Sequence, residues 1–386
     1  MHQDQPIPFN RAAIEGNELA YIQQALERGH TSSGGEFVKR AEEILLAEFS
    51  AQDVLLTTSC TSALELTALM LDLQPGDTVI VPSFTFTTTA LAFVRQGAKI
   101  KFCDIEPVTL GLDTEHLKSL LDETVRAVVP VHYAGVACDI DGMRKALVDW
   151  PDVAVIEDNA HGLFGRWNGQ PLGTLGRFAT QSFHDTKNIV CGEGGALVVN
   201  DPGDLDRVRV LYEKGTNRRA FFLGQVDKYS WKDTGSSFAL ANVLAAYLTA
   251  QLEKADVIQG KRRTVFERYE QALAPRVEEL GIRLPVVPEH CEQTYHMFYV
   301  LMPDRPTRDA VLSGMREQDI APTFHYVPLH SSEAGRKFSA AYAECPVSDD
   351  ISGRLIRLPF YNNLTEAESE RVIDSFVSVL TAARSS

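Results

Sequence analysis

The first candidate for chemistry in this chain is an acidic residue that directly follows a short apolar run. Asp158 ends the segment Val153 to Asp158. A carboxylate at the carboxyl end of a buried strand lies where parallel α/β sheets bind ligands. There it would pair with a cation such as a protonated ring nitrogen. From this segment alone, the alternative is that Asp158 caps the next helix.

A lysine in a turn is the second candidate. Lys187 follows Gln181 to His184 and precedes the glycine-rich stretch Gly192 to Gly195, which leads into the apolar run Ala196 to Val199. A lysine that reacts with an aldehyde cofactor must be partly desolvated or lie near positive charge, so that its neutral amine is available. The alternative is an exposed turn lysine, as most lysines are.

Two further segments complete the set of candidates. The hydroxyl-rich run Thr57 to Ser62 opens a helical pattern, and a helix N-terminus with Ser and Thr hydroxyls binds phosphate. Ordinary N-capping is the alternative. Phe86 follows the apolar run that ends at Val81, so it would stack on a planar ring or belong to the core.

Apolar runs that alternate with helical patterns predict how these residues are positioned. The predicted strands are Asp77 to Val81, Lys99 to Ile105, Ala127 to Val131, Val153 to Ile156 and Ala196 to Val199. Continuous apolar runs are typical of strands buried on both faces, so we expect an α/β protein with a mixed, mostly parallel sheet. The predicted helices are Glu36 to Phe49, Ser62 to Leu71, and one or two helices over Ala241 to Leu273.

Beyond Pro285 the pattern predicts a smaller α+β domain. Its predicted elements are strands at His296 to Leu301 and Thr323 to Val327 and helices at Arg308 to Gln318 and Glu366 to Leu380. We therefore expect a large domain over residues 1–255, which includes the N-terminal segment, and a small domain over 256–386.

Composition excludes several classes of protein. The 386 residues are 44% hydrophobic and 23% charged, as in ordinary globular proteins. A net charge of -15 argues against binding to nucleic acid or to an anionic membrane. The six cysteines show neither a C-x-x-C pair nor spacing suited to zinc, so we expect free thiols, no metal site and a cytoplasmic protein. No signal peptide or membrane-spanning run is expected.

The order of phosphate turn, aromatic residue, strand-end aspartate and loop lysine resembles the fold-type I pyridoxal 5′-phosphate (PLP) enzymes. More narrowly, the chain resembles the DegT/StrS family of sugar-nucleotide aminotransferases over almost its whole length. The matching segments include Ile7 to Asn10, Pro130 to Gly135 and Phe324 to His330. Within the family, it is most similar to the dTDP-4-amino-4,6-dideoxygalactose transaminase type. That similarity is carried by Ser59-Cys60-Thr61, Ser182-Phe183-His184, Lys214 to Arg218 and Gly224 to Tyr229.

The resemblance implies specific roles around the cofactor. Lys187 would hold PLP covalently and carry protons, and Asp158 would pair with the ring nitrogen. His161 would contact the phenolic oxygen, and Phe86 would stack on the ring. The phosphate would be held by Ser59, Cys60, Thr61 and Ser182, with Ser237 contributed by a partner subunit.

Substrate contacts and two departures from the family pattern also follow from the resemblance. The expected substrate-binding residues are His184, Asn217, Arg218, Arg219, Lys228, His325, Tyr326 and His330. From the residues alone, the basic members fit a solvated loop nearly as well, and the others could complete a core.

Gly235 to Ala239 replaces a family segment whose Asn reaches the phosphate across a dimer interface, and Cys60 replaces the commoner glycine.

The implied reaction transfers the amino group of L-glutamate to C4 of dTDP-4-keto-6-deoxy-D-glucose through the pyridoxamine form of PLP. The products are 2-oxoglutarate and a dTDP-4-amino-4,6-dideoxyhexose, whose gluco or galacto configuration stays open. A lysine at 187, where some relatives have histidine, favours transamination over dehydration. The alternatives are a different keto sugar, such as a 3-keto or GDP-linked one, a PLP dehydratase, or a non-catalytic PLP-binding regulator. A homodimer with shared active sites is implied.

Overall fold

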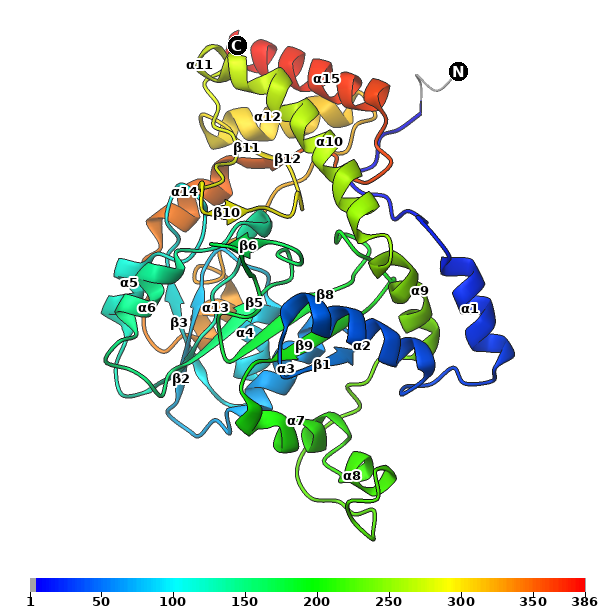
Figure 1. The fold of residues 1–386 in the computed structure, drawn as a ribbon. Coiled ribbons are helices and arrows are strands. Elements are labelled where there is room, and N and C mark those ends of the chain that lie inside the picture. The colour runs from blue at the N-terminus through cyan, green and yellow to red at the C-terminus, as the bar shows by residue number, and fades with distance from the viewer. Residues whose placement is uncertain (1–4, 386) are drawn as a thin grey trace.

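A seven-stranded sheet forms the centre of the larger part of the molecule in the computed structural model, which describes residues 5–385 (Figure 1). The strand order is β1-β9-β8-β5-β4-β2-β3. The bounds are β1 Asp53–Thr57, β2 Thr78–Pro82, β3 Lys99–Cys103, β4 Val125–Val128, β5 Ala154–Asp158, β8 Phe178–Ser182 and β9 Gly195–Val199. In this sheet of the described residues, β9 runs in the direction opposite to the other six strands, which therefore end at one common edge.

Helices cover both faces of this sheet because its side chains alternate between two apolar layers. Leu55 of β1 packs in one layer, whereas Val54 and Leu56 pack in the opposite one. The first layer is covered by α3 (Cys60–Met70), α4 (Thr88–Val94) and α7 (Leu205–Tyr212). The second is covered by α2 (Glu36–Phe49), α9 (Asn242–Leu252), α5 (Thr114–Leu120) and α6 (Ile140–Ala146). The expected mostly parallel α/β sheet with strands buried on both faces is thus confirmed.

The C-terminal part has its own core and lies above the sheet in Figure 1. Its elements are α10 (Ala255–Leu273), α11 (Val277–Leu280), β11 (Tyr299–Leu301), α12 (Arg305–Arg316), α14 (Pro346–Arg354), β12 (Leu355–Arg357) and α15 (Glu366–Ser385). The short helix α13 (Glu333–Phe338) lies instead against β3 of the large sheet. The expected strand over Thr323 to Val327 is reduced to a single bridge between Thr323 and Arg357. Two successive helices, α9 and α10, occupy Ala241 to Leu273.

The two cores meet along α10, which begins at Ala255, and the domain boundary expected at residue 255 stays a prediction. Ile258 packs with the large sheet, whereas Val265 and Phe266 pack in the C-terminal core. Ile7 also packs in the C-terminal core, and its backbone bonds to Asp319 and Ala321. The N-terminal segment therefore crosses from the small part to the large part before α1 (Glu18–Glu27).

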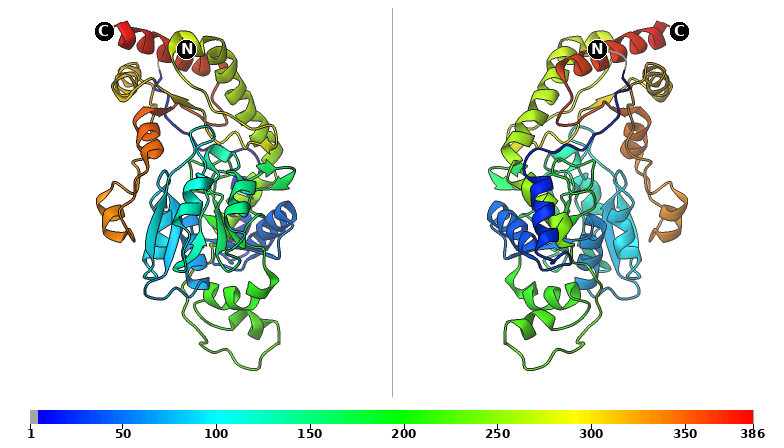
Figure 2. Two further views of the ribbon diagram at one scale, coloured as in Figure 1. Left: turned by 90° about the vertical axis from the view of Figure 1, so that its left-hand side faces the viewer. Right: turned by 90° about the vertical axis from the view of Figure 1, so that its right-hand side faces the viewer.

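Two short features complete the fold. The strands β6 (Arg166–Trp167), β7 (Gln170–Pro171) and β10 (Cys291–Glu292) form a small sheet. An arm around α8 (Arg218–Phe222) projects at the end of the molecule opposite the C-terminal part (Figure 2). Within residues 5–385, no helix combines the length and the apolar character needed to cross a membrane.

Candidate active site

A cavity of about 650 Å³ lies at the edge where the parallel strands end, beneath the C-terminal part. The loops after β1, β2, β5 and β8 contribute most of its wall, since parallel strands deliver their following loops to the same edge. The sequence-predicted residues that line it are Ser59, Cys60, Thr61, Phe86, Asp158, His161, Ser182, His184, Lys187, His325 and Tyr326. Segments far apart in the sequence are therefore brought to one site.

Asp158 is the buried carboxylate of this cavity, with 5% of its surface exposed. Its Oδ2 accepts a hydrogen bond from Thr89 Oγ1 at 2.7 Å, and its Oδ1 accepts one from the Ala160 amide at 3.3 Å. The chain continues from Asp158 as a turn, so the alternative role as a helix cap is wrong. Among the described residues, no basic side chain forms an ion pair with it, which leaves the carboxylate free to pair with a cationic ligand.

Lys187 lines the same cavity. Burial disfavours the charged ammonium and lowers the pKa of Lys187 to about 8. The positive charge of Arg357 also lowers the pKa of Lys187, whereas the negative charge of Asp158 raises it. The alternative of an exposed turn lysine is wrong, and the amine has the partly neutral character that a nucleophile needs.

The N-terminus of α3 forms another part of the wall. Ser59 caps this helix by accepting a hydrogen bond from the Ser62 amide at 3.1 Å, so the capping role that sequence left open is present. Gly195 pairs with both Thr57 and Ser182, and a Cβ at this glycine would lie 2.4 Å from the Cys60 nitrogen. This glycine lets the helix end, β8 and β9 come close enough to form one concave, amide-lined surface.

Cys60 keeps this surface free of negative charge. Its thiol donates to Thr180 Oγ1 at 3.5 Å, and burial raises the pKa of Cys60 to about 12. The residue is thus a neutral thiol beside the helix N-terminus. A phosphate would meet backbone amides and the Ser182 hydroxyl there without a competing thiolate.

His161 presents an unpartnered polar atom. The ring is stacked on His296 at 4.2 Å, and its buried Nδ1 has no hydrogen-bond partner among the described residues. Desolvation, with nearby Lys187 next in effect, lowers the pKa of His161 well below its usual range. A neutral imidazole with a free nitrogen is suited to a hydrogen bond with a ligand oxygen.

Phe86 and His184 line the cavity from its outer side. Phe86 is 57% exposed, so the interpretation that it belongs to the core is wrong. His184 is exposed beside Thr186. His325 stacks on Tyr326 at 3.9 Å, and both face the cavity from the C-terminal part.

The remaining predicted residues lie outside the cavity of this chain. Asn217, Arg218, Arg219 and Lys228 belong to the α8 arm, where Asn217 donates to the Lys228 carbonyl at 3.0 Å. Ser237 is exposed and pairs through its backbone with Glu213. His330 contacts Ser83 Oγ at 2.6 Å and Asp349 at 3.5 Å. Their expected roles in binding stay predictions.

Thr89, Arg357 and Phe9 are among the residues of the site that sequence reasoning missed. Thr89 holds Asp158, Arg357 lines the cavity, and Arg357 stacks on the Phe9 ring at 4.6 Å. One signal was visible for Arg357, because an arginine interrupts the apolar run from Leu355 to Leu358. Thr89 gave none, since a threonine inside a helical pattern has many ordinary uses.

These residues fit PLP on the evidence of their own chemistry. The cavity offers a desolvated amine for an aldehyde, an unpaired carboxylate for a ring nitrogen, an unpartnered imidazole nitrogen for a ring oxygen, and an amide-lined end for a phosphate. The fold and site together define a fold-type I PLP-dependent enzyme.

Comparison with known proteins narrows this class. The model of the DegT/DnrJ/EryC1/StrS aminotransferase family matches residues 12–377, and the chain belongs to that family. Its cofactor is accordingly PLP.

Solved structures agree over nearly the whole chain. The aminotransferase TlmJ from Streptoalloteichus hindustanus is 26% identical, with 98% of this chain and 100% of that chain covered and a TM-score of 0.89. The structure of 3-amino-5-hydroxybenzoic acid synthase is 25% identical, with 98% and 100% covered and a TM-score of 0.87. A putative sugar aminotransferase from Streptococcus pneumoniae in its pyridoxamine form shares the fold at 23% identity, with 98% and 100% covered and a TM-score of 0.90.

Proposed function

We propose that this aminotransferase transfers the amino group of L-glutamate to C4 of dTDP-4-keto-6-deoxy-D-glucose. The observation that carries the transamination is the placement of Lys187 and Asp158 in one cavity with the α3 N-terminus. The choice of sugar is supported by the similarity of Ser59-Cys60-Thr61, Ser182-Phe183-His184 and the Lys214 to Tyr229 region to enzymes of that type. The product is a dTDP-4-amino-4,6-dideoxyhexose, and 2-oxoglutarate is released.

PLP supplies an aldehyde that accepts amino groups and a ring that stabilises negative charge on the adjacent carbon. The residues of the chain provide the rest. In the first half-reaction the Lys187 amine would move a proton from the donor Cα to the cofactor carbon that carried the aldehyde, and in the second half it would move a proton from that carbon to C4 of the sugar. Asp158, held by Thr89, keeps the ring nitrogen protonated through its negative charge. Ser182 and the amides of Cys60 and Thr61 hold the phosphate, and His161 orients the ring.

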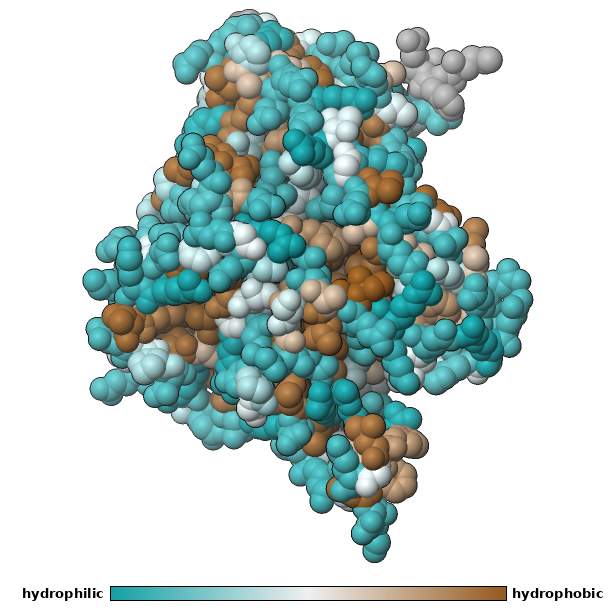
Figure 3. All heavy atoms as spheres, viewed as in Figure 1, coloured by the Kyte–Doolittle hydropathy of each residue, from teal (hydrophilic) through white to brown (hydrophobic). Residues whose placement is uncertain are grey.

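A homodimer is part of the proposal. Figure 3 shows hydrophobic side chains on the surface of the α8 arm among hydrophilic ones. The most exposed are Phe222, Leu223, Tyr229 and Trp231. An arm of this composition is suited to a second copy of the chain, where Asn217, Arg218, Arg219, Lys228 and Ser237 would reach the partner's cavity. Sedimentation of the purified protein tests this, and a monomer at all concentrations would contradict it.

Two half-reactions test the activity. L-glutamate should convert the visible absorption of the holoenzyme to that of the pyridoxamine form, and Lys187→Ala should abolish the change. The pyridoxamine form is then mixed with dTDP-4-keto-6-deoxy-D-glucose, and NMR identifies the position and configuration of the amine. If no aminated product forms, the substrate is wrong, and 3-keto or GDP-linked sugars are tested next. If L-glutamate and other amino acids leave the spectrum unchanged, transamination from these donors is wrong, and the alternatives of a PLP dehydratase and a PLP-binding regulator are tested next.

A further inference from the structure

Asn188, the residue after Lys187, connects the lysine turn to a segment far away in the sequence. The turn is exposed at Asp185, whereas Asn188 is 5% exposed. Its Nδ2 donates to the carbonyl of Thr294 at 2.6 Å and to Gln259 Oε1 at 3.0 Å. Since these contacts use both N–H groups of the amide, the amide oxygen Oδ1 is left to accept a hydrogen bond.

That oxygen faces His296 and decides where the ring of this histidine carries its proton. Asn188 Oδ1 lies 2.8 Å from His296 Nδ1. Because an amide oxygen only accepts, Nδ1 of the ring is the protonated nitrogen. Desolvation, with nearby His161 and Lys187 next in effect, lowers the pKa of His296 well below its usual range, so the ring is neutral. The Asn188 amide and the His296 ring therefore fix each other in one orientation.

The face of the His296 ring contacts a second residue of the cavity, His161. The two ring centroids are 4.2 Å apart and the planes differ by 16°. The contacts of the His161 ring with Tyr133 and His325 are longer, at 5.9 and 6.4 Å. Thr294 also donates its hydroxyl to the His161 carbonyl at 2.7 Å. The segment from Thr294 to His296 thus holds both the backbone and the ring of His161.

The backbone of this segment is strained. Tyr295 has a φ of 50°, in the left-handed region that bulky residues rarely adopt. Arg262 of α10 stabilises it by donating to the carbonyls of Tyr295 at 3.0 Å and His296 at 2.6 Å. Such conformations persist where the surrounding structure imposes them, and they cluster at active sites. The strain therefore indicates that the placement of His296 matters to the site.

We propose that His296 is a positioning residue for the transamination: its Nδ1 holds the turn of Lys187 through Asn188, and its ring face holds His161. One histidine before β11 thereby aligns the amine that moves the proton with the imidazole that orients the cofactor ring. This inference rests on the roles of Lys187 and His161 in the proposed function. It does not depend on the acceptor sugar, because both residues act in both half-reactions.

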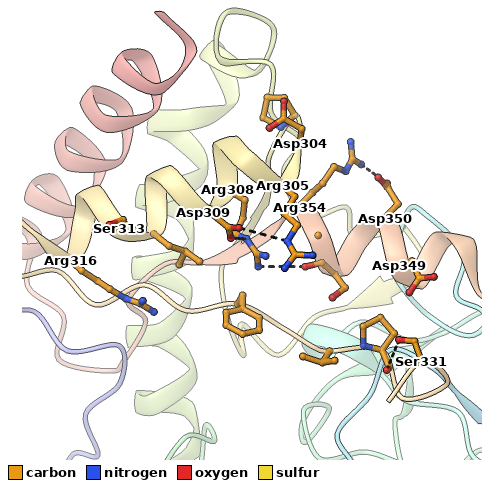
Figure 4. A pocket seen from close by; sticks show the side chains of 17 residues that line it. Asp304, Arg305, Arg308, Asp309, Ser313, Arg316, Ser331, Asp349, Asp350 and Arg354 are labelled. Carbon is orange, nitrogen blue, oxygen red and sulfur yellow. Dashed lines mark hydrogen bonds and ion pairs between the residues drawn. The ribbon is translucent and has the colours of Figure 1, made fainter. Parts of the chain in front are cut away.

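A larger groove of the C-terminal part supplies a control instead of a second site. It measures about 950 Å³ and is lined by residues of α12 and α14 (Figure 4). Arg308 lies 2.7 Å from the Asp309 carboxylate and Arg354 lies 3.1 Å from that of Asp350, so these charges already compensate each other. Val311 of α12 is fully buried in the C-terminal core. Val311→Ala should therefore lower stability without touching the catalytic cavity.

Two substitutions of His296 separate its two contacts. His296→Phe keeps an aromatic face for His161 but cannot donate to Asn188. His296→Asn keeps an N–H donor near the position of Nδ1 but has no ring. Asn188→Leu removes the same hydrogen bond from the other side, and Val311→Ala controls for a general loss of stability.

Acetylation of the apoenzyme tests the hold on Lys187 without cofactor or turnover. Its pH dependence at Lys187 has a midpoint near 8 in the wild type, because burial lowers the pKa of this amine. His296→Phe and Asn188→Leu should raise the midpoint, since a released turn admits water to the amine. His296→Asn and Val311→Ala should leave it near 8. If the midpoint stays near 8 in both His296→Phe and Asn188→Leu, the proposed hold on the lysine is wrong.

The half-reaction with L-glutamate tests alignment in the holoenzyme. His296→Phe should lower the maximal rate about 10- to 100-fold, as expected for a misplaced catalytic group, while the half-saturating glutamate concentration changes less than about threefold. The double variant His296→Phe/Asn188→Leu should be no slower than the slower single variant, because both substitutions remove one contact. Equal slowing in Val311→Ala would overturn the proposal, since the loss would then follow from stability alone.

The ring face has its own measurement. His296→Asn should bind PLP several-fold more weakly and shift the visible absorption of the holoenzyme, because the His161 ring loses its closest ring contact. His296→Phe should keep both properties. Unchanged affinity and absorption in His296→Asn would overturn the role of the ring face. If a His296 variant does not fold, Asn188→Leu decides the hold on Lys187 by the same acetylation and rate measurements.

Failure of the proposed function gives a different result. In that case the wild type shows no conversion with L-glutamate, or Lys187→Ala still shows it. The acetylation midpoints of the apoenzyme variants still report whether His296 and Asn188 hold the turn.

Discussion

The titration of Lys187 is the sharpest consequence of the cavity, because burial places its pKa at about 8 instead of the ordinary 10.5. At pH 7, an amine with a pKa of 8 is about 9% neutral, whereas one with a pKa of 10.5 is about 0.03% neutral. Only the neutral amine attacks an aldehyde or an anhydride. In the apoenzyme, the neutral fraction of Lys187 at pH 7 should therefore be about 300-fold larger than it would be with an ordinary pKa, and its reactivity should rise accordingly.

Competitive labelling measures this titration directly. The apoenzyme is treated with a trace of acetic anhydride between pH 6 and pH 11, and acetylation at Lys187 is compared by mass spectrometry with the exposed Lys118 in the same digest. Reactivity at Lys187 should rise with pH, reach half of its maximum near pH 8 and level off above about pH 9, where about nine-tenths of the amine is neutral.

Two variants separate the causes of the shift. Asp158→Asn removes a negative charge that favours the ammonium, so the pKa of Lys187 should fall further. Arg357→Gln removes a positive charge that disfavours it, so the pKa should rise. A midpoint near the ordinary value in the wild type, or shifts of the same sign in both variants, would refute this account of the electrostatics.

Three further predictions concern stability and cofactor binding. Thr89→Val should lower the free energy of unfolding of the apoenzyme by about 1.5–3 kcal/mol, because the Asp158 carboxylate loses the hydrogen bond that the Thr89 hydroxyl donates. Urea unfolding measures this loss, and Thr89→Ser, which keeps the hydroxyl, should retain most of the stability. Gly195→Ala should weaken PLP binding in an absorbance titration, because its Cβ would meet the Cys60 amide, whereas Gly260→Ala, with open space around it, should bind PLP normally. Ser182→Ala should lower PLP affinity roughly tenfold or more if its hydroxyl binds the phosphate, and unchanged affinity would remove it from the site.

Much of the fold follows from sequence because it depends on local patterns. The apolar runs of β2 and β9 are buried throughout, and the predicted helix Glu36 to Phe49 has the bounds of α2. A strand buried on both faces needs apolar residues at every position, so its signal is strong. The segment after Thr323 was harder to predict, because its short apolar pattern suits an extended chain with one bridge equally well.

The residue types of the catalytic centre were also determined by the sequence. A strand-end aspartate, a turn lysine and a hydroxyl-rich helix start each had an ordinary alternative, and their order along the chain made the catalytic interpretation the better one. The tertiary structure decided which alternatives held. It buried Asp158 and Lys187 in one cavity, and it left the predicted basic cluster on an arm away from the cavity of the same chain.

Arg357 shows most clearly what only the tertiary structure could decide. Its position in an apolar run predicts a buried residue, but a buried arginine is usually neutralised by a partner that sequence does not reveal. The structure shows one histidine contact and no carboxylate for it among the described residues. Whether a charge is compensated depends on the groups that surround it in space. Residues 9, 187, 325 and 357 are far apart in the sequence and lie together because the C-terminal part packs over the edge of the sheet.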